Sequence, residues 1–263
     1  MDISSVVGVV LGIACILFGQ FLEGGNIQSL LQVTAALIVF GGTAGAVILS
    51  FPAPDLMFAV ESLSMVFSGK KIDYDKVITE IIGFATKARK EGVIALEKEA
   101  AKASDSLLKM GLEAVSDGAD PVLVRDLMET QLSQLEERVT RASKVWESAG
   151  GYSPTVGIIG AVLGLIQVMQ NLSEPAKLGA GIAVAFVATV YGVGAANLIL
   201  IPLGSKIKFK SKQDFLAKMI MIEGILSIQA GESPALIERK LKAFLIEKSS
   251  SGNAKTANKE AQA

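Results

Sequence analysis

The chain contains no histidine and a single cysteine, Cys15, among its 263 residues. Without histidine, the protein cannot contain a histidine-dependent catalytic triad, a histidine-rich metal site or a cysteine–histidine nucleophile. One cysteine cannot form an internal disulfide, and we interpret Cys15 as a small packing residue in an apolar segment. The sequence therefore offers no catalytic residue, no metal site and no cofactor site, and we expect that the protein is not an enzyme.

Two short motifs suggest chemistry, but their surroundings do not support it. Ser68-Gly69-Lys70-Lys71 matches the S-x-x-K pattern without the other motifs of penicillin-binding proteins. Gly192-Val193-Gly194 resembles the start of a dinucleotide fingerprint, but it lies in an apolar segment and follows no strand. We interpret the first motif as a turn and the second as a site of helix packing.

Charge is absent from four long segments of the chain. Asp, Glu, Lys and Arg are missing between Asp2 and Glu23, from Gly24 to Pro54, from Ser148 to Ser173, and from Leu178 to Ser205. Each segment is long enough to cross a bilayer as a helix, which needs roughly 20 apolar residues. Short linkers join the first segment to the second and the third to the fourth, so the sequence predicts two transmembrane hairpins.

The basic residues indicate how these hairpins are oriented. Of the 25 Lys and Arg residues, 13 lie from Lys70 to Lys144 and 11 from Lys206 to Lys259. Because Lys and Arg stay on the cytoplasmic side of a membrane, we expect both blocks and both chain termini in the cytoplasm. The first span lacks the basic start and the cleavage site of a signal peptide, so we expect it to remain in the protein.

The predicted fold class is all-α, a polytopic membrane protein with four transmembrane helices and a helical cytoplasmic domain. We expect transmembrane helices 1 and 2 in residues 1–50 and a cytoplasmic helical loop in residues 51–150. Transmembrane helices 3 and 4 are expected in residues 151–205, followed by cytoplasmic helices in residues 206–248. Residues 249–263 are rich in Ser, Lys, Asn and Ala, which favours a disordered tail.

Local signals subdivide the cytoplasmic loop. Gly92 and Gly111 are expected breaks, and Asp120 is expected to cap a long helix that begins at Pro121. Apolar residues recur along this helix at intervals of three to five, which predicts a buried stripe. The stripe comprises Leu127, Leu132, Leu135, Val139, Ala142 and Trp146. A second stripe follows the fourth span and comprises Phe215, Met219, Ile222, Ile225, Leu226 and Ile228.

Lysines at alternate positions follow the fourth span. Lys206, Lys208 and Lys210 lie where the chain is expected to leave the membrane. We interpret them as an anchor to the anionic headgroups of inner membrane lipids, and not as a nucleic-acid site.

The uncharged spans have consequences for ion transport. Because no span carries Asp, Glu, Lys or Arg, a channel built from this chain needs an ionisable group from another chain. Glycine pairs such as Gly160 and Gly164 allow helices to approach closely, either within one chain or within an oligomer. Pro154 is expected to begin the third span and Pro202 to end the fourth. The Thr189 hydroxyl is expected to bond to a carbonyl of its own helix.

Four segments together carry a family resemblance: Ala88–Glu97, Ser153–Leu165, Ala188–Gly192 and Ile222–Gly231. From Met1 to about Leu245 the chain resembles the MotA/PomA family of flagellar motor stator subunits. The ExbB and TolQ subunits resemble the chain in spans three and four, but they have three spans and lack the segment Ala88–Glu97 of the cytoplasmic loop.

The resemblance implies a proton-conducting channel in the bacterial inner membrane. In this family five copies surround two copies of MotB, which supplies the ion-binding aspartate. Ion flow is converted into torque on the rotor protein FliG, without covalent catalysis. Two alternatives remain open, namely a sodium-coupled PomA-type stator and an ExbB/TolQ-type energiser of a periplasm-spanning partner.

The resemblance also implies roles for particular residues. Arg89 and Glu97, with Lys90 beside them, match the loop charges that contact FliG. On an unbroken helix, Arg89 and Glu97 would lie about 80° apart around the axis and roughly 12 Å apart along it, so both would reach one partner surface.

The remaining implied residues lie along the ion path. Pro154 and Pro202 match the prolines that couple ion binding to cytoplasmic movement. Thr189 matches the threonine that faces the MotB aspartate, and Tyr191 lies just beyond it. Sodium-type relatives carry a second threonine where this chain has Ala161. One hydroxyl fewer is poor coordination for a hard cation, so the sequence predicts proton coupling.

Overall fold

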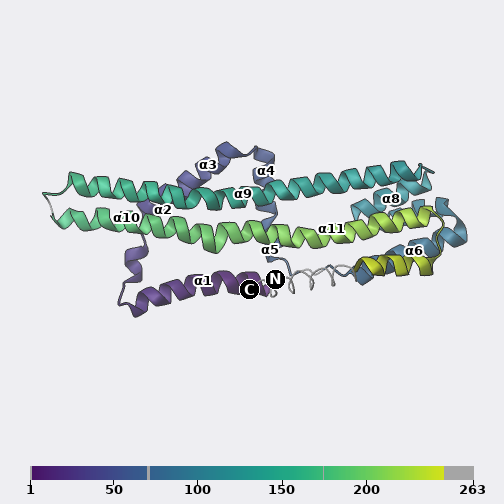
Figure 1. Ribbon diagram of the computed structural model, residues 1–263, viewed down its shortest axis with the longest axis horizontal. Helices are drawn as coiled ribbons and strands as arrows, with labels where there is room; N and C mark the ends of the chain where they lie inside the picture. The colour runs from purple at the N-terminus through teal and green to yellow at the C-terminus, as the bar shows by residue number, and fades with distance from the viewer. Residues whose placement is uncertain (1, 70–71, 174, 246–263) are drawn as a thin grey trace, which may run out of the picture. The chain divides into compact units, whose positions relative to one another are not determined.

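The computed structural model describes residues 2–69, 72–173 and 175–245, and these residues form helices without any β-strand (Figure 1). The predicted all-α fold is confirmed. The predicted disordered tail, residues 249–263, lies outside the described residues.

The chain forms two compact units. We call residues 1–70 and 137–211 the membrane unit, and residues 71–136 and 212–263 the charged unit. Two long helices, α9 (Pro121–Gln170) and α11 (Ile201–Gln229), contribute residues to both units. These units reflect packing, whereas the segment boundaries expected from the sequence reflect membrane topology, so those boundaries stay a prediction.

Four helical stretches of the described chain are long and apolar enough to cross a membrane. They are Ile3–Leu22, Ile27–Ser50, Pro121–Gln170 and Leu178–Gln229, and each overlaps one of the four spans expected from the sequence. The membrane unit contains α1 (Ile3–Leu22), η1 (Ile27–Leu30), α2 (Val33–Ala36), η2 (Leu37–Gly41), α3 (Gly42–Ser50), α4 (Ala53–Glu61), α5 (Leu63–Phe67), α10 (Pro175–Ala195) and η4 (Ala196–Leu200). Its hydrophobic contacts join α2 and η2 to α10, and α3 and α4 to α9.

Glycines let α9 and α10 lie side by side (Figure 1). A Cβ atom at Gly160 would lie 2.7 Å from the Ala188 Cβ, and one at Gly164 would lie 2.7 Å from the backbone nitrogen of Ala185. Such distances are shorter than side chains tolerate, so these two glycines serve close packing within one chain. At Gly41 an added Cβ would meet no described atom within 4 Å.

Pro154 and Pro202 lie in helices that continue past them, so the prediction that they mark the ends of membrane spans stays a prediction. Pro154 lies inside α9, and Pro202 is the second residue of α11, directly after the π-helical segment η4. Proline cannot donate to the carbonyl four residues earlier. The π segment accommodates Pro202 because the N–H of Ile201 bonds five residues back, to Ala196.

The charged unit has its own hydrophobic core. It is built from α6 (Tyr74–Glu91), η3 (Val93–Ala95), α7 (Leu96–Ala100), α8 (Ser106–Ser116), the start of α9, the end of α11 and a helix over residues 234–245. Its largest fully buried side chains are Ile78, Ile81, Leu96, Leu108, Leu112, Met128, Ile220, Ile225, Ile237 and Leu241. The core thus joins segments from both basic blocks of the sequence.

Local expectations in this unit are partly confirmed. The Asp120 carboxylate accepts a hydrogen bond from the backbone of Val122 at the start of α9, as expected of a cap. Gly92 adopts φ 85° and ends α6, which confirms that break. The break expected at Gly111 is wrong, because Gly111 lies inside α8, where the Met128 side chain and Ile225 leave no room for a Cβ.

Candidate functional site

The candidate rotor contact lies where α6 passes into α7. Arg89 and Lys90 occupy the last turn of α6, and Glu97 lies in the first turn of α7. The helix is broken between them, since Gly92 adopts a positive φ that favours glycine. The helical angle and spacing expected for Arg89 and Glu97 therefore do not apply, and the short helix η3 sets their separation instead.

Charged residues of this turn fall into two groups. Lys87 and Glu99 pair at 2.7 Å, and Lys102 joins Glu99 at 2.9 Å. The hydrogen bond from Lys87, followed by that from Lys102, lowers the pKa of Glu99, and the bond to Glu99 raises the pKa of Lys87. These three residues bind one another and fix α6 against α7.

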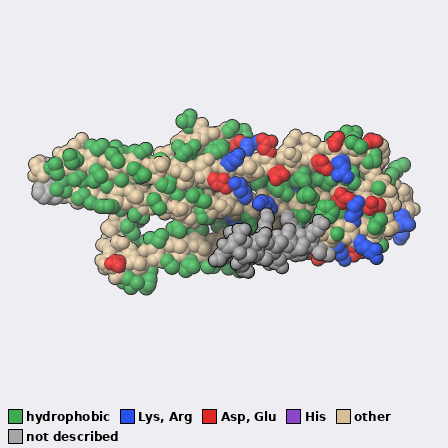
Figure 2. All heavy atoms as spheres, in the orientation of Figure 1, with side chains coloured by type: hydrophobic (Ala, Val, Ile, Leu, Met, Phe, Trp, Pro, Cys, Tyr) green, Lys and Arg blue, Asp and Glu red, His purple; other side chains and the backbone are tan. Residues whose placement is uncertain are grey.

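The second group consists of Arg89, Lys90, Glu91, Glu97 and Lys98, and the rotor-contact prediction concerns Arg89, Lys90 and Glu97. All three side chains are exposed, and within the described ranges no ion pair or hydrogen bond engages them. Figure 2 shows many Lys, Arg, Asp and Glu side chains over the charged unit, and mainly hydrophobic side chains over the apolar stretches of the membrane helices. Charges without an internal partner, as at Arg89, Lys90 and Glu97, are available to an external one.

Sequence reasoning missed the apolar part of this turn. Ile94 is 74% exposed and Val93 is 37% exposed, and both lie between the charged residues in η3. The next residue but one, Leu96, is fully buried and anchors the turn. We call Arg89, Lys90, Val93, Ile94 and Glu97 the tip. The signal in the sequence was the apolar pair Val93-Ile94 directly after the helix-ending Gly92. Such a pair is ordinarily interpreted as part of the hydrophobic core.

The candidate ion-path residues Pro154 and Thr189 come together where α9 meets α10. A Cβ at Gly192 would lie 2.6 Å from the Ser153 carbonyl oxygen and 3.3 Å from the Pro154 Cα. A Cβ at Gly157 would lie 3.5 Å from the Thr189 Cα. The proline and the threonine thus border one tight helix contact.

Hydroxyl groups at this contact differ in their bonding. The Thr189 hydroxyl donates to the Ala185 carbonyl at 3.3 Å, which confirms the expected bond within its own helix. The Ser153 hydroxyl is fully buried and finds no hydrogen-bond partner among the described residues. Ala161 is half-buried on α9.

Tyr191 faces the second span and takes no part in the Pro154–Thr189 contact. Its hydroxyl donates to the Leu30 carbonyl and accepts from the Gln32 N–H at 3.3 Å. Its ring stacks on Phe40 with 5.9 Å between the ring centroids. Tyr191 therefore joins α10 to the second span, a structural role that its sequence position did not indicate.

The three lysines of the expected membrane anchor have partners within the membrane unit. Lys206 and Lys210 contact the Asp2 carboxylate at 3.1 and 3.0 Å, and Lys210 also donates to backbone carbonyls at the end of α5. Lys208 pairs with Glu147 at 2.8 Å. These bonds fix α1, α5 and α9 to α11, and contact of the lysines with lipid headgroups stays a prediction.

Comparison with known proteins agrees with this arrangement. Residues 6–92 match the motility protein A N-terminal family, and residues 99–219 match the MotA/TolQ/ExbB proton channel family. Motility protein A of Helicobacter pylori is 37% identical over 241 residues, which cover 92% of this chain and 94% of that protein. The chain belongs to the motility protein A family. The family resemblance inferred from the sequence is thereby confirmed.

Solved structures of the motility protein A family have the same fold. The structure of C. jejuni MotAB aligns with a TM-score of 0.87 at 33% identity, covering 93% of this chain and 96% of that one. The flagellar MotAB stator complex from Bacillus subtilis aligns with a TM-score of 0.85 at 33% identity, covering 96% and 100%. Among the residues that our structure describes, no group of His, Cys, Asp and Glu is placed to hold a metal ion.

Proposed function

We infer that the protein is a flagellar motor stator subunit that forms an ion channel with MotB and uses ion flow to turn the rotor. The observation that carries this inference is that the four segments expected to cross the membrane contain no Asp, Glu, Lys, Arg or His in a chain of the proton channel family. An ion that crosses the membrane needs a group that binds and releases it. MotB is the partner in the solved complexes of relatives. In this proposal, an aspartate of MotB is the group that binds and releases the ion.

The coupling ion in this proposal is the proton. Thr189 offers a hydroxyl oxygen near the α9–α10 contact, whereas Ala161 offers none. Sodium prefers several oxygen ligands, and a proton needs only the carboxylate. We expect that cells relying on this chain keep swimming when sodium is removed and stop when a protonophore is added. Strict sodium dependence would contradict proton coupling and favour a PomA-type stator.

We propose an assembly of five copies around two copies of MotB in the bacterial inner membrane, with both termini in the cytoplasm. The first helix supports an oligomer, because α1, described over its whole length, has no buried residue. An apolar helix that buries none of its residues within its own chain has apolar surface left to pack against lipid or against other chains. The function is energy transduction and involves no covalent catalysis.

The rotor contact is assigned to the tip, whose partner in this proposal is FliG. Support comes from the contrast between the paired charges Lys87 and Glu99 and the unpaired charges Arg89, Lys90 and Glu97. The exposed Ile94 adds an apolar centre to a charged rim, which is the usual composition of a protein interface. This exposed tip favours a stator over an ExbB/TolQ-type energiser, which lacks the corresponding loop segment.

Charge reversals test this assignment directly. Arg89→Glu and Glu97→Lys should each weaken binding of the purified complex to FliG about fivefold at low salt, and less at high salt, because exposed charge pairs are screened. Lys76→Glu is the matched control, since Lys76 is an exposed residue near the start of the same helix, α6. Equal losses for Lys76→Glu and Arg89→Glu would contradict a contact located at the tip.

A further inference from the structure

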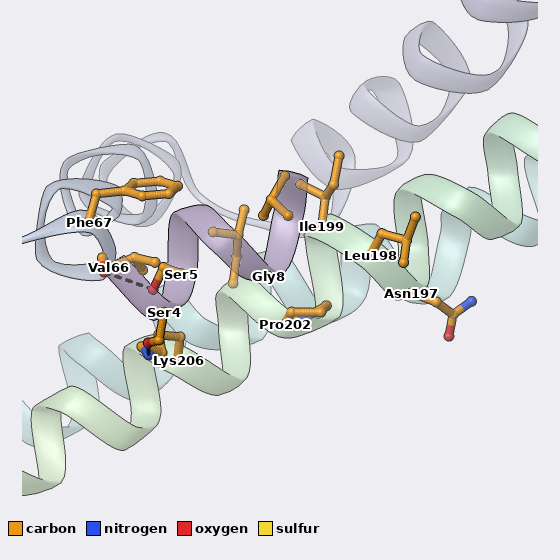
Figure 3. Close-up of a pocket in the computed structure, with 12 residues that line it drawn as sticks. Ser4, Ser5, Gly8, Val66, Phe67, Asn197, Leu198, Ile199, Pro202 and Lys206 are labelled. Atoms are coloured by element: carbon orange, nitrogen blue, oxygen red, sulfur yellow. Dashed lines mark hydrogen bonds between the residues drawn. The ribbon is translucent and has the colours of Figure 1, made fainter. Parts of the chain in front are cut away.

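A cavity of about 350 Å³ opens in the membrane unit beside Pro202 (Figure 3). Its walls come from the first turns of α1, the end of α5, the π segment η4 and the start of α11. All of these elements belong to the membrane unit. The cavity therefore lies within the membrane unit.

The cavity is apolar along its walls and polar at one end. Apolar side chains contributed by all four elements line it: Val9, Val66, Phe67, Leu198, Ile199 and Leu203. Figure 3 shows Lys206 and Ser4 together at one end, and Asn197 at the other with its amide turned away. The Asn197 amide donates to the Val193 carbonyl of its own helix, so it is satisfied without entering the cavity.

The polar end carries a net positive charge. Lys206 and Lys210 share the single Asp2 carboxylate, which leaves one positive charge in excess. Lys210 is occupied by carbonyl oxygens of α5. Lys206 donates to Asp2 and to the Ser4 hydroxyl, and an ammonium group has three donors, so one donor remains. That side chain is 29% exposed and can reach an anion.

We propose that this cavity holds an acyl chain of an inner-leaflet phospholipid whose anionic headgroup contacts Lys206. An apolar cavity with a cationic end is complementary to an amphiphile that has an apolar tail and a negative headgroup. It is complementary neither to a free anion nor to a wholly apolar helix. The choice of the inner leaflet depends on the membrane orientation of the chain given under Proposed function. Because Pro202 forms part of the wall, movement at this proline changes the space available to the acyl chain.

The chain offers a well-matched pair of variants for testing the proposal. Gly8 lines the cavity, and an added Cβ there would meet no described atom within 4 Å. Gly8→Leu therefore adds a side chain at the cavity wall whose Cβ meets no described neighbour. Gly19 lies on the same helix, also has no described atom within 4 Å, and does not line the cavity. Gly19→Leu adds the same side chain elsewhere on α1.

The experiment uses the complex of this chain with MotB in phosphatidylcholine vesicles that contain phosphatidylglycerol with a photoactivatable acyl chain. After irradiation, we expect labelled peptides from the first turns of α1 and from residues 197–203. Gly8→Leu should reduce this labelling about tenfold, since even two methylene groups of acyl-chain burial are worth that factor. Gly19→Leu should leave it unchanged. Lys206→Gln should reduce the preference for phosphatidylglycerol over phosphatidylcholine about fivefold.

Three results would overturn the proposal. The first is equal labelling of wild type and Gly8→Leu. The second is absence of label in the wild type together with efficient cross-linking between copies through a cysteine placed at Gly8, because a second copy would then occupy the cavity. The third is an unchanged headgroup preference in Lys206→Gln. If only the proposed orientation were wrong, labelling would persist but would come from probe placed in the opposite leaflet. Loss of rotor function alone would not alter labelling.

Discussion

The close backbone contact between α9 and α10 makes a sharp prediction for Gly192→Ala. The added Cβ would lie 2.6 Å from the Ser153 carbonyl oxygen, 3.1 Å from the Gly157 Cα and 3.3 Å from the Pro154 Cα. All three neighbours are backbone atoms, so no side chain can move aside and the helices must separate. Overpacking of this kind costs about 1–3 kcal/mol, which exceeds the gain of up to about 1 kcal/mol from replacing glycine within a helix.

Gly194→Ala is the matched control, because a Cβ at Gly194 would meet no described atom within 4 Å. It has only the favourable effect of helix propensity and should be neutral or stabilising. In thermal unfolding of the purified complex, we expect the Tm of Gly192→Ala to fall about 3–6 °C below that of Gly194→Ala. Equal Tm values for the two variants would refute the close backbone contact between α9 and α10.

Three further predictions concern single contacts. Tyr191→Phe leaves the Leu30 carbonyl without its donor and should destabilise the complex by about 1–2 kcal/mol in thermal unfolding, whereas Tyr152→Phe, which loses a bond between exposed groups to Ser50, should cost less. The Lys218 side chain is only 10% exposed, and its ammonium group lies 2.8 Å from the Asp105 carboxylate. Lys218→Met leaves that carboxylate without this partner and should lower the free energy of unfolding by about 2 kcal/mol. The double variant Lys218→Met, Asp105→Asn should recover part of this loss. The pKa of Asp2 is held well below its ordinary value of 3.8 by hydrogen bonds from Ser4, Lys210 and Lys206. Its stabilising effect is therefore fully present above that ordinary value and is lost as the pH falls below it, and Asp2→Asn should make acid unfolding less steep there; an unchanged acid profile would count against the Asp2 contacts.

The membrane spans could be predicted because the bilayer imposes a simple requirement on composition. A helix that crosses lipid must be apolar and about 20 residues long, and the charge-free segments of this chain meet both conditions. Helix starts were also readable where a cap is local, as at Asp120 and Pro121. In each case the deciding physics lies within a few residues of the chain.

Features that depend on distant residues could not be read in the same way. Leu127 and Met219 were expected in buried stripes, yet they are 45% and 48% exposed, because Val124, Met128 and Ile220 face the core instead. The continuation of α11 through Pro202 depends on the π segment before it. The exposure of Ile94 depends on how Leu96 anchors the turn. Such choices between neighbouring apolar residues are made by tertiary packing.

In the candidate site too, some features could be predicted from the sequence and others are seen only in the structure. The family resemblance identified Arg89, Lys90 and Glu97, but only the structure separates them from the paired charges Lys87 and Glu99. The structure also shows that the Tyr191 hydroxyl bonds to Leu30 near the second span and that Lys206 pairs with Asp2 of the same chain. The roles of the tip and of the α9–α10 contact in rotation stay predictions.

The most direct test of the central claim is rotation of tethered cells that lack their own stator genes. We expect rotation when this chain is expressed with MotB, and none when it is expressed alone. We also expect none with a MotB variant whose ion-binding aspartate is replaced by asparagine, since the spans of this chain carry no Asp, Glu, Lys or Arg. Sustained rotation with that MotB variant would show that the ion carrier lies elsewhere, and it would contradict the account.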